Sequence, residues 1–104
     1  MAIINPFAPS AGTGQLITTS GSSQVVTLAQ NDSVVRVTNY GATNPAYIRV
    51  GMAPATGSLT ATTADMVIFP NSYVNIWKGE MNALAALQLT GATTLQIMTG
   101  TGGI

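Results

Sequence analysis

Arg36, Tyr47 and Arg49 are the residues of this chain whose types and spacing are best suited to chemistry. They lie within the stretch Ser33–Met52, where two β-branched runs flank a short Gly-Ala-Thr-Asn-Pro insert. Gly relaxes φ and Pro cannot donate to a ladder, so the insert predicts a hairpin turn. Clustered Tyr and Arg side chains are typical of binding hot spots. The stretch therefore predicts recognition of a partner or an anion, and nothing in it predicts catalysis.

The register of this hairpin follows if Val37 pairs with Ile48. Side chains alternate along a strand, so Arg36 then lies directly opposite Arg49, on the same face as Tyr47, while the other face is mostly apolar. Like charges that oppose each other across a ladder destabilise it. We therefore expect a carboxylate or another anion between or above the two guanidinium groups.

The carboxylates do not form an enzyme-like constellation. The sequence contains no His and no Cys, which removes the commonest general base, the commonest metal ligand and any thiolate. Asp32, Asp65 and Glu80 are the only acidic residues, and each stands at a turn, where such side chains usually cap the backbone. We expect no enzymatic activity, no catalytic residue, no metal site and no cofactor.

The composition is unusual for a free soluble domain. The chain has 104 residues, enough for one domain, and only 6% of them are charged, against about 25% in a typical protein. The formal net charge is zero. Low surface charge promotes association, so the composition predicts a subunit of an assembly. A small domain that tolerates a neutral Thr/Ser surface is the alternative.

Several classes of partner are disfavoured by the sequence. Three cationic residues cannot neutralise many phosphates, so nucleic-acid binding is not expected. No apolar run approaches the roughly 20 residues of a membrane span. The first residues lack the basic region and long apolar core of a signal peptide. We expect no membrane partner and synthesis in the cytoplasm.

Residues Met1–Gly14 read as an extended N-terminal arm, since prolines and a Gly-rich hinge oppose both helix and ladder. The arm nevertheless carries the apolar side chains of Ile3, Ile4 and Phe7. They either tuck back onto their own core or reach a neighbouring subunit. An arm behind a flexible hinge favours the second interpretation in an assembly.

From residue 15 to residue 104 the chain alternates short β-rich runs with turns, which predicts an all-β domain of about eight short antiparallel strands. Such spacing is typical of a small β-sandwich or barrel. The polar segment 53–64 is long enough to be a functional loop or a crossover between sheets. The expected strands are Gln15–Thr19, Gln24–Leu28, Ser33–Tyr40, Ala46–Val50, Asp65–Phe69, Tyr73–Lys78, Ala83–Thr90 and Thr94–Thr99.

Trp77 has two interpretations. Trp77 alternates with Ile76, so one of the two points away from the core. If Val74 and Ile76 point into the core, we expect Trp77 and Lys78 to lie at the rim. The alternative is that Trp77 is itself a core residue, because Trp is buried more often than not.

Three segments together resemble a family. VRVTNYGATNPAYIRVG, ATTADMVIFPNSYVNIWKG and the closing TLQIMTGTGG are similar to small tailed-bacteriophage proteins that decorate, or cement, the capsid. The resemblance covers Ser33–Gly103 and leaves out the arm. It implies a jelly-roll-like sandwich, a homotrimer on the outside of the capsid, the major capsid protein as partner, and neither cofactor nor chemistry.

We therefore expect a non-enzymatic structural virion protein that binds the capsid surface and stabilises the shell by bridging capsomers. The alternative is a head-fibre or tail-associated module that contacts a host glycan or another virion protein. The residues expected at the interface are Ile3, Ile4, Phe7, Arg36, Tyr47, Arg49 and Trp77.

Overall fold

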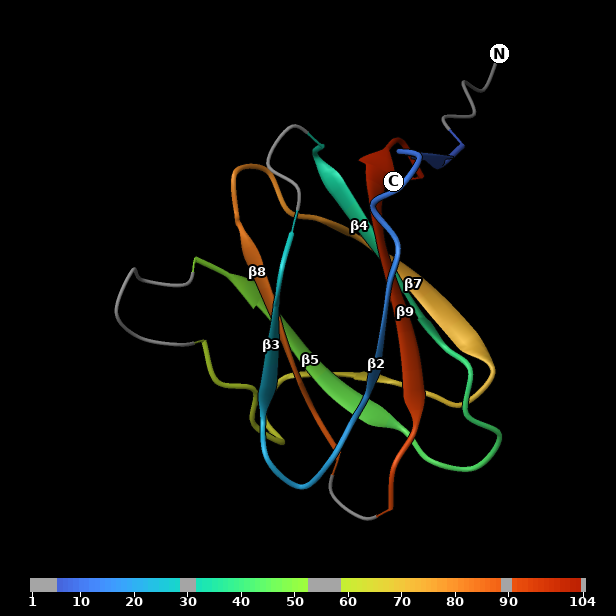
Figure 1. Cartoon of the computed structure of the whole chain (residues 1–104), viewed down its shortest axis with the longest axis vertical. Helices are drawn as coiled ribbons and strands as arrows, with labels where there is room; N and C mark the ends of the chain where they lie inside the picture. The colour runs from blue at the N-terminus through green and yellow to red at the C-terminus, as the bar shows by residue number, and fades with distance from the viewer. Residues whose placement is uncertain (1–5, 29–31, 53–58, 89–90, 104) are drawn as a thin grey trace.

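The computed structural model describes residues 6–28, 32–52, 59–88 and 91–103. Within these ranges nine strands form two sheets that face each other, and every strand pair is antiparallel (Figure 1). The predicted all-β fold is confirmed. No helix able to span a membrane is found in the described part of the chain.

The first sheet, sheet A, has the order β1-β9-β4-β7, and β2 also pairs with β9 beside β1. Its strands are β1 (Ala8–Pro9), β2 (Gln15–Thr18), β4 (Val34–Asn39), β7 (Ser72–Trp77) and β9 (Thr94–Thr101). The second sheet, sheet B, has the order β3-β8-β5-β6. Its strands are β3 (Gln24–Thr27), β5 (Ala46–Gly51), β6 (Met66–Ile68) and β8 (Ala83–Leu87).

The strand pairs are nested inside one another. β5 pairs with β6, β4 with β7, β3 with β8 and β2 with β9, so each pair encloses the preceding one along the chain. Because these pairs belong alternately to sheet B and sheet A, the chain crosses from sheet to sheet at nearly every loop. The fold is thus a long hairpin rolled into two layers (Figure 1).

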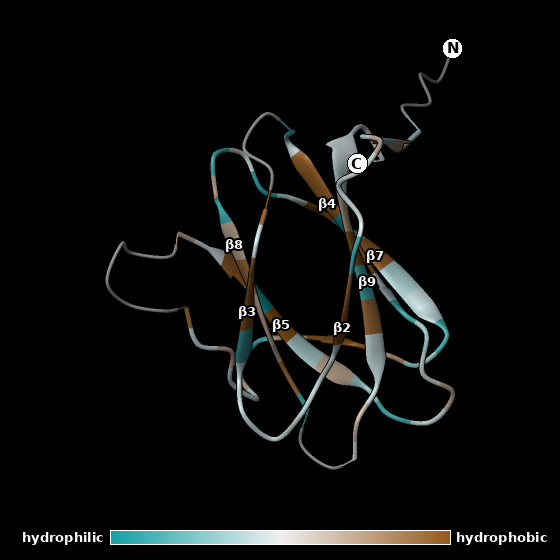
Figure 2. Ribbon diagram, viewed as in Figure 1, coloured by the Kyte–Doolittle hydropathy of each residue, from teal (hydrophilic) through white to brown (hydrophobic). Residues whose placement is uncertain are grey.

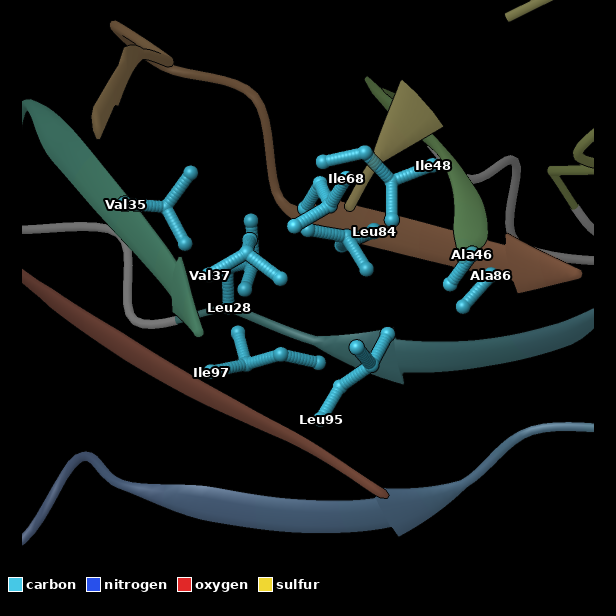
Figure 3. Close-up of a cluster of buried hydrophobic side chains, with 10 residues drawn as sticks. All are labelled: Leu28, Val35, Val37, Ala46, Ile48, Ile68, Leu84, Ala86, Leu95 and Ile97. Carbon is cyan, nitrogen blue, oxygen red and sulfur yellow. The ribbon is translucent and has the colours of Figure 1, made fainter. Parts of the chain in front are cut away.

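The core lies between the two sheets and follows the alternation of the strands. Val35 and Val37 of β4 point inward from sheet A, and Leu84 and Ala86 of β8 point inward from sheet B, all without measurable exposure. β-branched and aliphatic residues at every second position form one apolar face per strand, as Figure 2 shows by its brown bands. The members of the cluster, drawn in Figure 3, are Leu28, Val35, Val37, Ala46, Ile48, Ile68, Leu84, Ala86, Leu95 and Ile97.

The expected hairpin between residues 33–40 and 46–50 is wrong, although both runs are strands. β4 lies in sheet A and β5 in sheet B. Val37 pairs with Val74 and Ile97, not with Ile48. The insert 41–45 carries the chain from one sheet to the other. The inward faces were predicted correctly, since Val37 and Ile48 belong to the same core cluster, but they contribute to it from opposite sheets.

Asn39 holds this corner in place. Its side chain has no exposed area, and its Nδ2 donates to the carbonyl oxygens of Asn44 (3.0 Å) and Ile68 (3.1 Å). Its Oδ1 accepts from the N–H of Gly41 (2.8 Å) and from the hydroxyl of Thr93 (2.6 Å). One amide therefore ties the end of β4 to the crossing loop, to β6 of the other sheet and to the start of β9.

The segment 53–64 is not a crossover between sheets. It joins β5 to β6, which are paired neighbours in sheet B. Residues 53–58 of this segment lie outside the described part of the chain.

The described part of the N-terminal arm lies on its own domain. β1 pairs with the end of β9, with Ala8 opposite Thr101 and Pro9 opposite Gly100. The two termini therefore leave the same end of sheet A (Figure 1). Ile3 and Ile4, two of the residues expected at an interface, lie outside the described residues.

Candidate functional site

The outer face of sheet B is covered by its own chain. Ala83 and Ala85 alternate with the core residues of β8 and so point outward, yet they are only 1% and 0% exposed. The loop that follows β5 lies over them: a Cβ at Gly51, the partner of Ala83, would lie 3.1 Å from Cδ1 of Leu59. Ala61 of the same loop is also buried. The loop therefore covers the centre of this face, and exposed apolar side chains remain at its borders, such as Val25 on β3 and Phe69 after β6.

The outer face of sheet A is open. Side chains that alternate with core positions project from it, and four large apolar ones remain mostly exposed. They are Leu16 (65% exposed), Tyr40 (55%), Tyr73 (60%) and Trp77 (64%). We call this surface the open face. Large apolar side chains gathered on one face of a small domain are typical of an interaction surface.

Arg36 stands at the centre of the open face, between two aromatic rings. Its guanidinium carbon lies 4.5 Å from the ring centroid of Phe7 and 4.3 Å from that of Tyr73. Its Nε donates to Oδ1 of Asn75 (2.8 Å), and Nδ2 of Asn75 donates to the carbonyl oxygen of Gly103 (3.1 Å). We call Arg36 and the rings of Phe7 and Tyr73 the Arg36 stack. Together with Asn75, the stack joins the arm, β4, β7 and the C-terminal segment of one chain.

The predicted opposition of Arg36 and Arg49 is wrong, because the two residues belong to different sheets. Arg36 stands opposite Asn75 and Met98, whereas Arg49 stands opposite Ala85 on the outer face of sheet B. The expected anion is found only for Arg49, whose Nε lies 2.9 Å from Oδ1 of Asp65 in an exposed ion pair. At Arg36 the aromatic rings of Phe7 and Tyr73 contact the guanidinium group in place of an anion.

Tyr47 shares the outer face of sheet B with Arg49, as alternation predicts, and is half-buried between Leu87 and Val67 on the neighbouring strands. The structure therefore does not bring Tyr47 and Arg49 together with Arg36, Phe7 and Trp77. The expected interface residues fall on two opposite faces of the sandwich.

Replacing Arg36 with alanine is expected to lower the free energy of unfolding of the isolated chain by about 2 kcal/mol. The loss combines two cation–π contacts of about 0.5–1 kcal/mol each with a charge-assisted hydrogen bond. Arg36→Lys keeps the charge but not the planar fork, so it should recover less than half of the loss. Chemical denaturation of the three proteins measures both values. Equal stability of Arg36→Ala and the parent would show that the stack contributes nothing to the fold.

Trp77 lies outside the core, so the interpretation as a core tryptophan is wrong. Its ring covers Gly79, where a Cβ would come within 2.6 Å of Cη2 and where φ is +55°, a conformation that suits glycine. Beside the ring lies an open, largely apolar hollow of about 670 Å³. Its lining residues are Met52, Trp77, Lys78, Gly79, Glu80 and Met81.

The expectation that Lys78 lies at the rim is wrong, because Lys78 is fully buried. Its Nζ donates to the carbonyl oxygens of Gly79 and Met81, both at 3.3 Å. Alternation along β7 extends to this residue, because Lys78 has the same inward direction as Val74 and Ile76. Burial lowers the pKa of Lys78, and the nearby charge of Asp32 partly opposes that shift.

Two of the three carboxylates, Asp32 and Asp65, make hydrogen bonds within the fold. Asp32 accepts hydrogen bonds from the hydroxyls of Ser10 and Thr99, both at 2.7 Å, which lower its pKa. The resulting stability is present above the carboxyl's unfolded pKa and is lost as the pH falls through the folded one. Asp65 accepts from the N–H of Thr62 (2.7 Å) and so caps a turn, as predicted. No three acidic side chains converge on a metal-sized site in the described ranges.

Sequence reasoning missed Leu16, Tyr40 and Tyr73 as parts of one face. The position of Tyr73 on this face could have been predicted, because Tyr73 precedes Trp77 by four residues in the same strand and both side chains therefore point to one side of the sheet. Leu16 could not, since its neighbour β9 lies about eighty residues away in the chain, as the pairing of Leu16 with Gln96 shows. Chemically the open face is neutral and aromatic with one guanidinium, which suits contact with another protein surface.

Comparison with known proteins gives a likeness of fold. No protein-family model matches the sequence, and no curated protein matches it. Among solved structures, a crystal structure of PirA has a TM-score of 0.52 and 13% identity, over 86% of this chain and 95% of that one. A structure described under "Bacillus endospore appendages form a novel family of disulfide-linked pili" reaches a TM-score of 0.43 at 11% identity, over 93% of this chain and 90% of that one, too low to carry an argument. The similarity to PirA thus supports the all-β sandwich and leaves its function open.

Proposed function

We propose that this chain is a non-enzymatic structural virion protein that attaches to the outside of a bacteriophage capsid and bridges neighbouring capsomers. The major capsid protein is its partner, and a homotrimer is the form that the resemblance implies. The observation that carries the proposal is the contrast between the two outer faces. The centre of sheet B is covered by its own loop and its exposed apolar residues lie at the borders, whereas the open face exposes four large apolar side chains.

The strand order supports the proposal at the level of architecture. The sheets β2-β9-β4-β7 and β3-β8-β5-β6, with their nested pairs, are the order expected of an eight-stranded jelly roll. Jelly rolls are common in viral capsid proteins and also in lectins, so this support is an analogy of fold.

The mechanism would be passive. A subunit that binds only the assembled shell stabilises it by linkage, in proportion to its occupancy. A neutral surface suits this role because it meets no long-range repulsion from either capsomer. The Arg36 stack would keep the centre of the open face rigid, so that little side-chain entropy is lost on docking.

The test is binding to expanded empty capsids of the phage that carries this gene, measured by co-sedimentation. The double variant Leu16→Lys/Tyr40→Lys places two charges on the open face and should reduce the bound copies at least about tenfold. The matched control, Met66→Lys/Phe69→Lys, changes two exposed apolar residues on sheet B and the loop after it, and should bind like the parent. Equal binding by the face variant would overturn the proposed surface, and no binding by the parent would overturn the function.

The second candidate is a head-fibre or tail-associated module that contacts a host glycan or another virion protein. The exposed Trp77 ring beside the hollow favours it, since sugars stack on such rings. Binding of the parent to a glycan array, lost in Trp77→Ala and absent on capsids, would establish this candidate instead.

A further inference from the structure

The edge of sheet A at β7 differs from the other sheet borders described. β7 has six residues with no charge and no proline, and no strand lies beyond it. The opposite border holds β1, a two-residue strand that contains Pro9, and the four-residue β2. The borders of sheet B are β3 with four residues and β6 with three. Short strands and prolines are ordinary protection against edge pairing, and β7 has neither.

The backbone groups that face outward from β7 can be identified from the ladder. The N–H of Lys78 donates to the carbonyl of Ser33 (2.8 Å), one step beyond the Val34–Trp77 pair. Close hydrogen-bonded pairs recur at every second residue of an antiparallel ladder, so β7 bonds to β4 through its even-numbered residues. The N–H and C=O groups of Tyr73, Asn75 and Trp77 therefore point away from the sheet. The bond from the N–H of Tyr40 to the carbonyl of Thr94 (2.9 Å) fits the same alternation on the other side of β4.

We propose that β7 pairs with β7 of a second copy of this chain, antiparallel and centred on Asn75. In this register Tyr73 faces Trp77 of the copy and Asn75 faces Asn75, so all three outward-facing residues of each strand meet outward-facing residues. Shifting the centre to Val74 or Ile76 leaves one end residue of each strand without such a partner. The central register thus forms the most backbone hydrogen bonds.

The side chains of β7 are self-complementary in the same register. Tyr73–Trp77, a favourable aromatic pair, occurs twice on the outer side, and Val74–Ile76 occurs twice on the inner side. The side chain of Asn75, on the two-fold axis, is already bonded to Arg36 and Gly103, so only its backbone is needed there. No charged residue within the strand opposes its copy. This palindromic chemistry indicates a second copy of the chain as the occupant of the edge.

A two-fold contact is separate from the trimer implied by the resemblance, because a three-fold ring uses heterologous contacts. It uses Tyr73 and Trp77 at the β7 border of the open face and leaves Leu16 and Tyr40 uncovered, since edge pairing extends a sheet sideways. The inference does not depend on capsid binding. If the inference fails, the purified protein will be a monomer or a lone trimer in solution. If the proposed function fails, the protein will not bind capsids.

The test is the mass of the purified protein by light scattering on a sizing column at tens of micromolar. A particle of twice the 10.6 kDa chain, or a hexamer if the trimer also forms, is the expected result. A monomer or a lone trimer would overturn the inference.

Paired variants test the register. Tyr73→Lys/Trp77→Lys and Tyr73→Glu/Trp77→Glu should each weaken the two-fold contact at least about tenfold, since like charges would then face each other. Mixing the two variants should restore a one-to-one complex, because each Lys would face a Glu. The open-face variant Leu16→Lys/Tyr40→Lys is the matched control and should keep the parent's mass. An unchanged mass in the edge variants, with folding confirmed by circular dichroism, would exclude β7 as the contact, as would failure of the mixture to associate.

Discussion

The Asn39→Ala variant is expected to lose about 4 kcal/mol of its free energy of unfolding. The substitution removes an amide that makes four hydrogen bonds without solvent access. Each buried group left without a partner costs about 1–3 kcal/mol, and two carbonyls, one N–H and one hydroxyl lose theirs together. Some of these four groups will form hydrogen bonds with water after the structure relaxes. The total loss of stability is therefore smaller than the sum of the four separate costs. Urea denaturation followed by tryptophan fluorescence measures the loss.

The matched control is Asn44→Ala. Asn44 belongs to the same corner, but its Nδ2 makes one exposed hydrogen bond, to the carbonyl of Ala92 (3.0 Å). Its loss should cost about 1 kcal/mol or less. Similar costs for the two variants would contradict the role assigned to Asn39 as the amide that joins both sheets.

The Gly100→Ala variant is expected to release the arm from β9 and to destabilise the domain by about 1–3 kcal/mol, the range of an overpacked site. A Cβ at Gly100 would overlap the carbonyl oxygen of Ala8 and would lie 2.9 Å from Cα of Pro9, both backbone atoms of β1. Backbone atoms cannot relieve such an overlap by a change of rotamer, as the end of a side chain can. The whole of β1 must therefore move away from β9. Phe7 would then leave the Arg36 ring stack. Hydrogen exchange should rise at least about tenfold in residues 10–14, where local opening replaces protection.

Gly21→Ala is the control for this substitution. No atom lies within 4 Å of a Cβ at Gly21, so alanine there should be neutral or slightly stabilising. Unchanged exchange in the Gly100→Ala arm would mean that β1 does not hold the arm in solution. Removal of residues 1–14 should then cost no stability either.

The positions of the strands could be predicted because they depend on local signals. Alternation and β-branched residues marked all eight of the expected runs, and the turn residues between them set their ends to within a few positions. The ninth strand, β1, was missed because its two residues, Ala8 and Pro9, make ladder contacts without any strand pattern of their own.

Strand pairing could not be predicted in the same way. A five-residue insert such as 41–45 can close a hairpin or cross between sheets, and its Gly and Pro suit both. Tertiary contacts decide the matter: Asn39 bonds the insert on one side and Ile68 of sheet B on the other. The incorrect pairing then placed Arg36 opposite Arg49, so the error in the site followed from the error in topology.

The site was partly predictable where alternation alone was sufficient. It placed Tyr47 on an outward face, and of the two interpretations of Trp77 the structure confirms the position outside the core. The expectation for Lys78 was wrong because strict alternation puts residue 78 on the same side as Val74 and Ile76. Of the aromatic partners of Arg36, Phe7 required knowledge that the arm folds back, and Tyr73 required knowledge that β4 pairs with β7. No local signal in the chain provides either.

The nested pairing has a consequence for synthesis on the ribosome. β9 lies between β1, β2 and β4, and contacts such as that between Thr13 and Thr99 span 86 residues. Sheet A therefore cannot close until residues 94–101 have left the exit tunnel, and such distant contacts make folding slow. A nascent chain interrupted before that point could pair β4 with β7, but β2 would have no neighbour in sheet A, so apolar side chains would stay available to chaperones and proteases. Translation of β9 is thus required for sheet A to be completed, so that only chains that contain this strand can fold and become available for assembly.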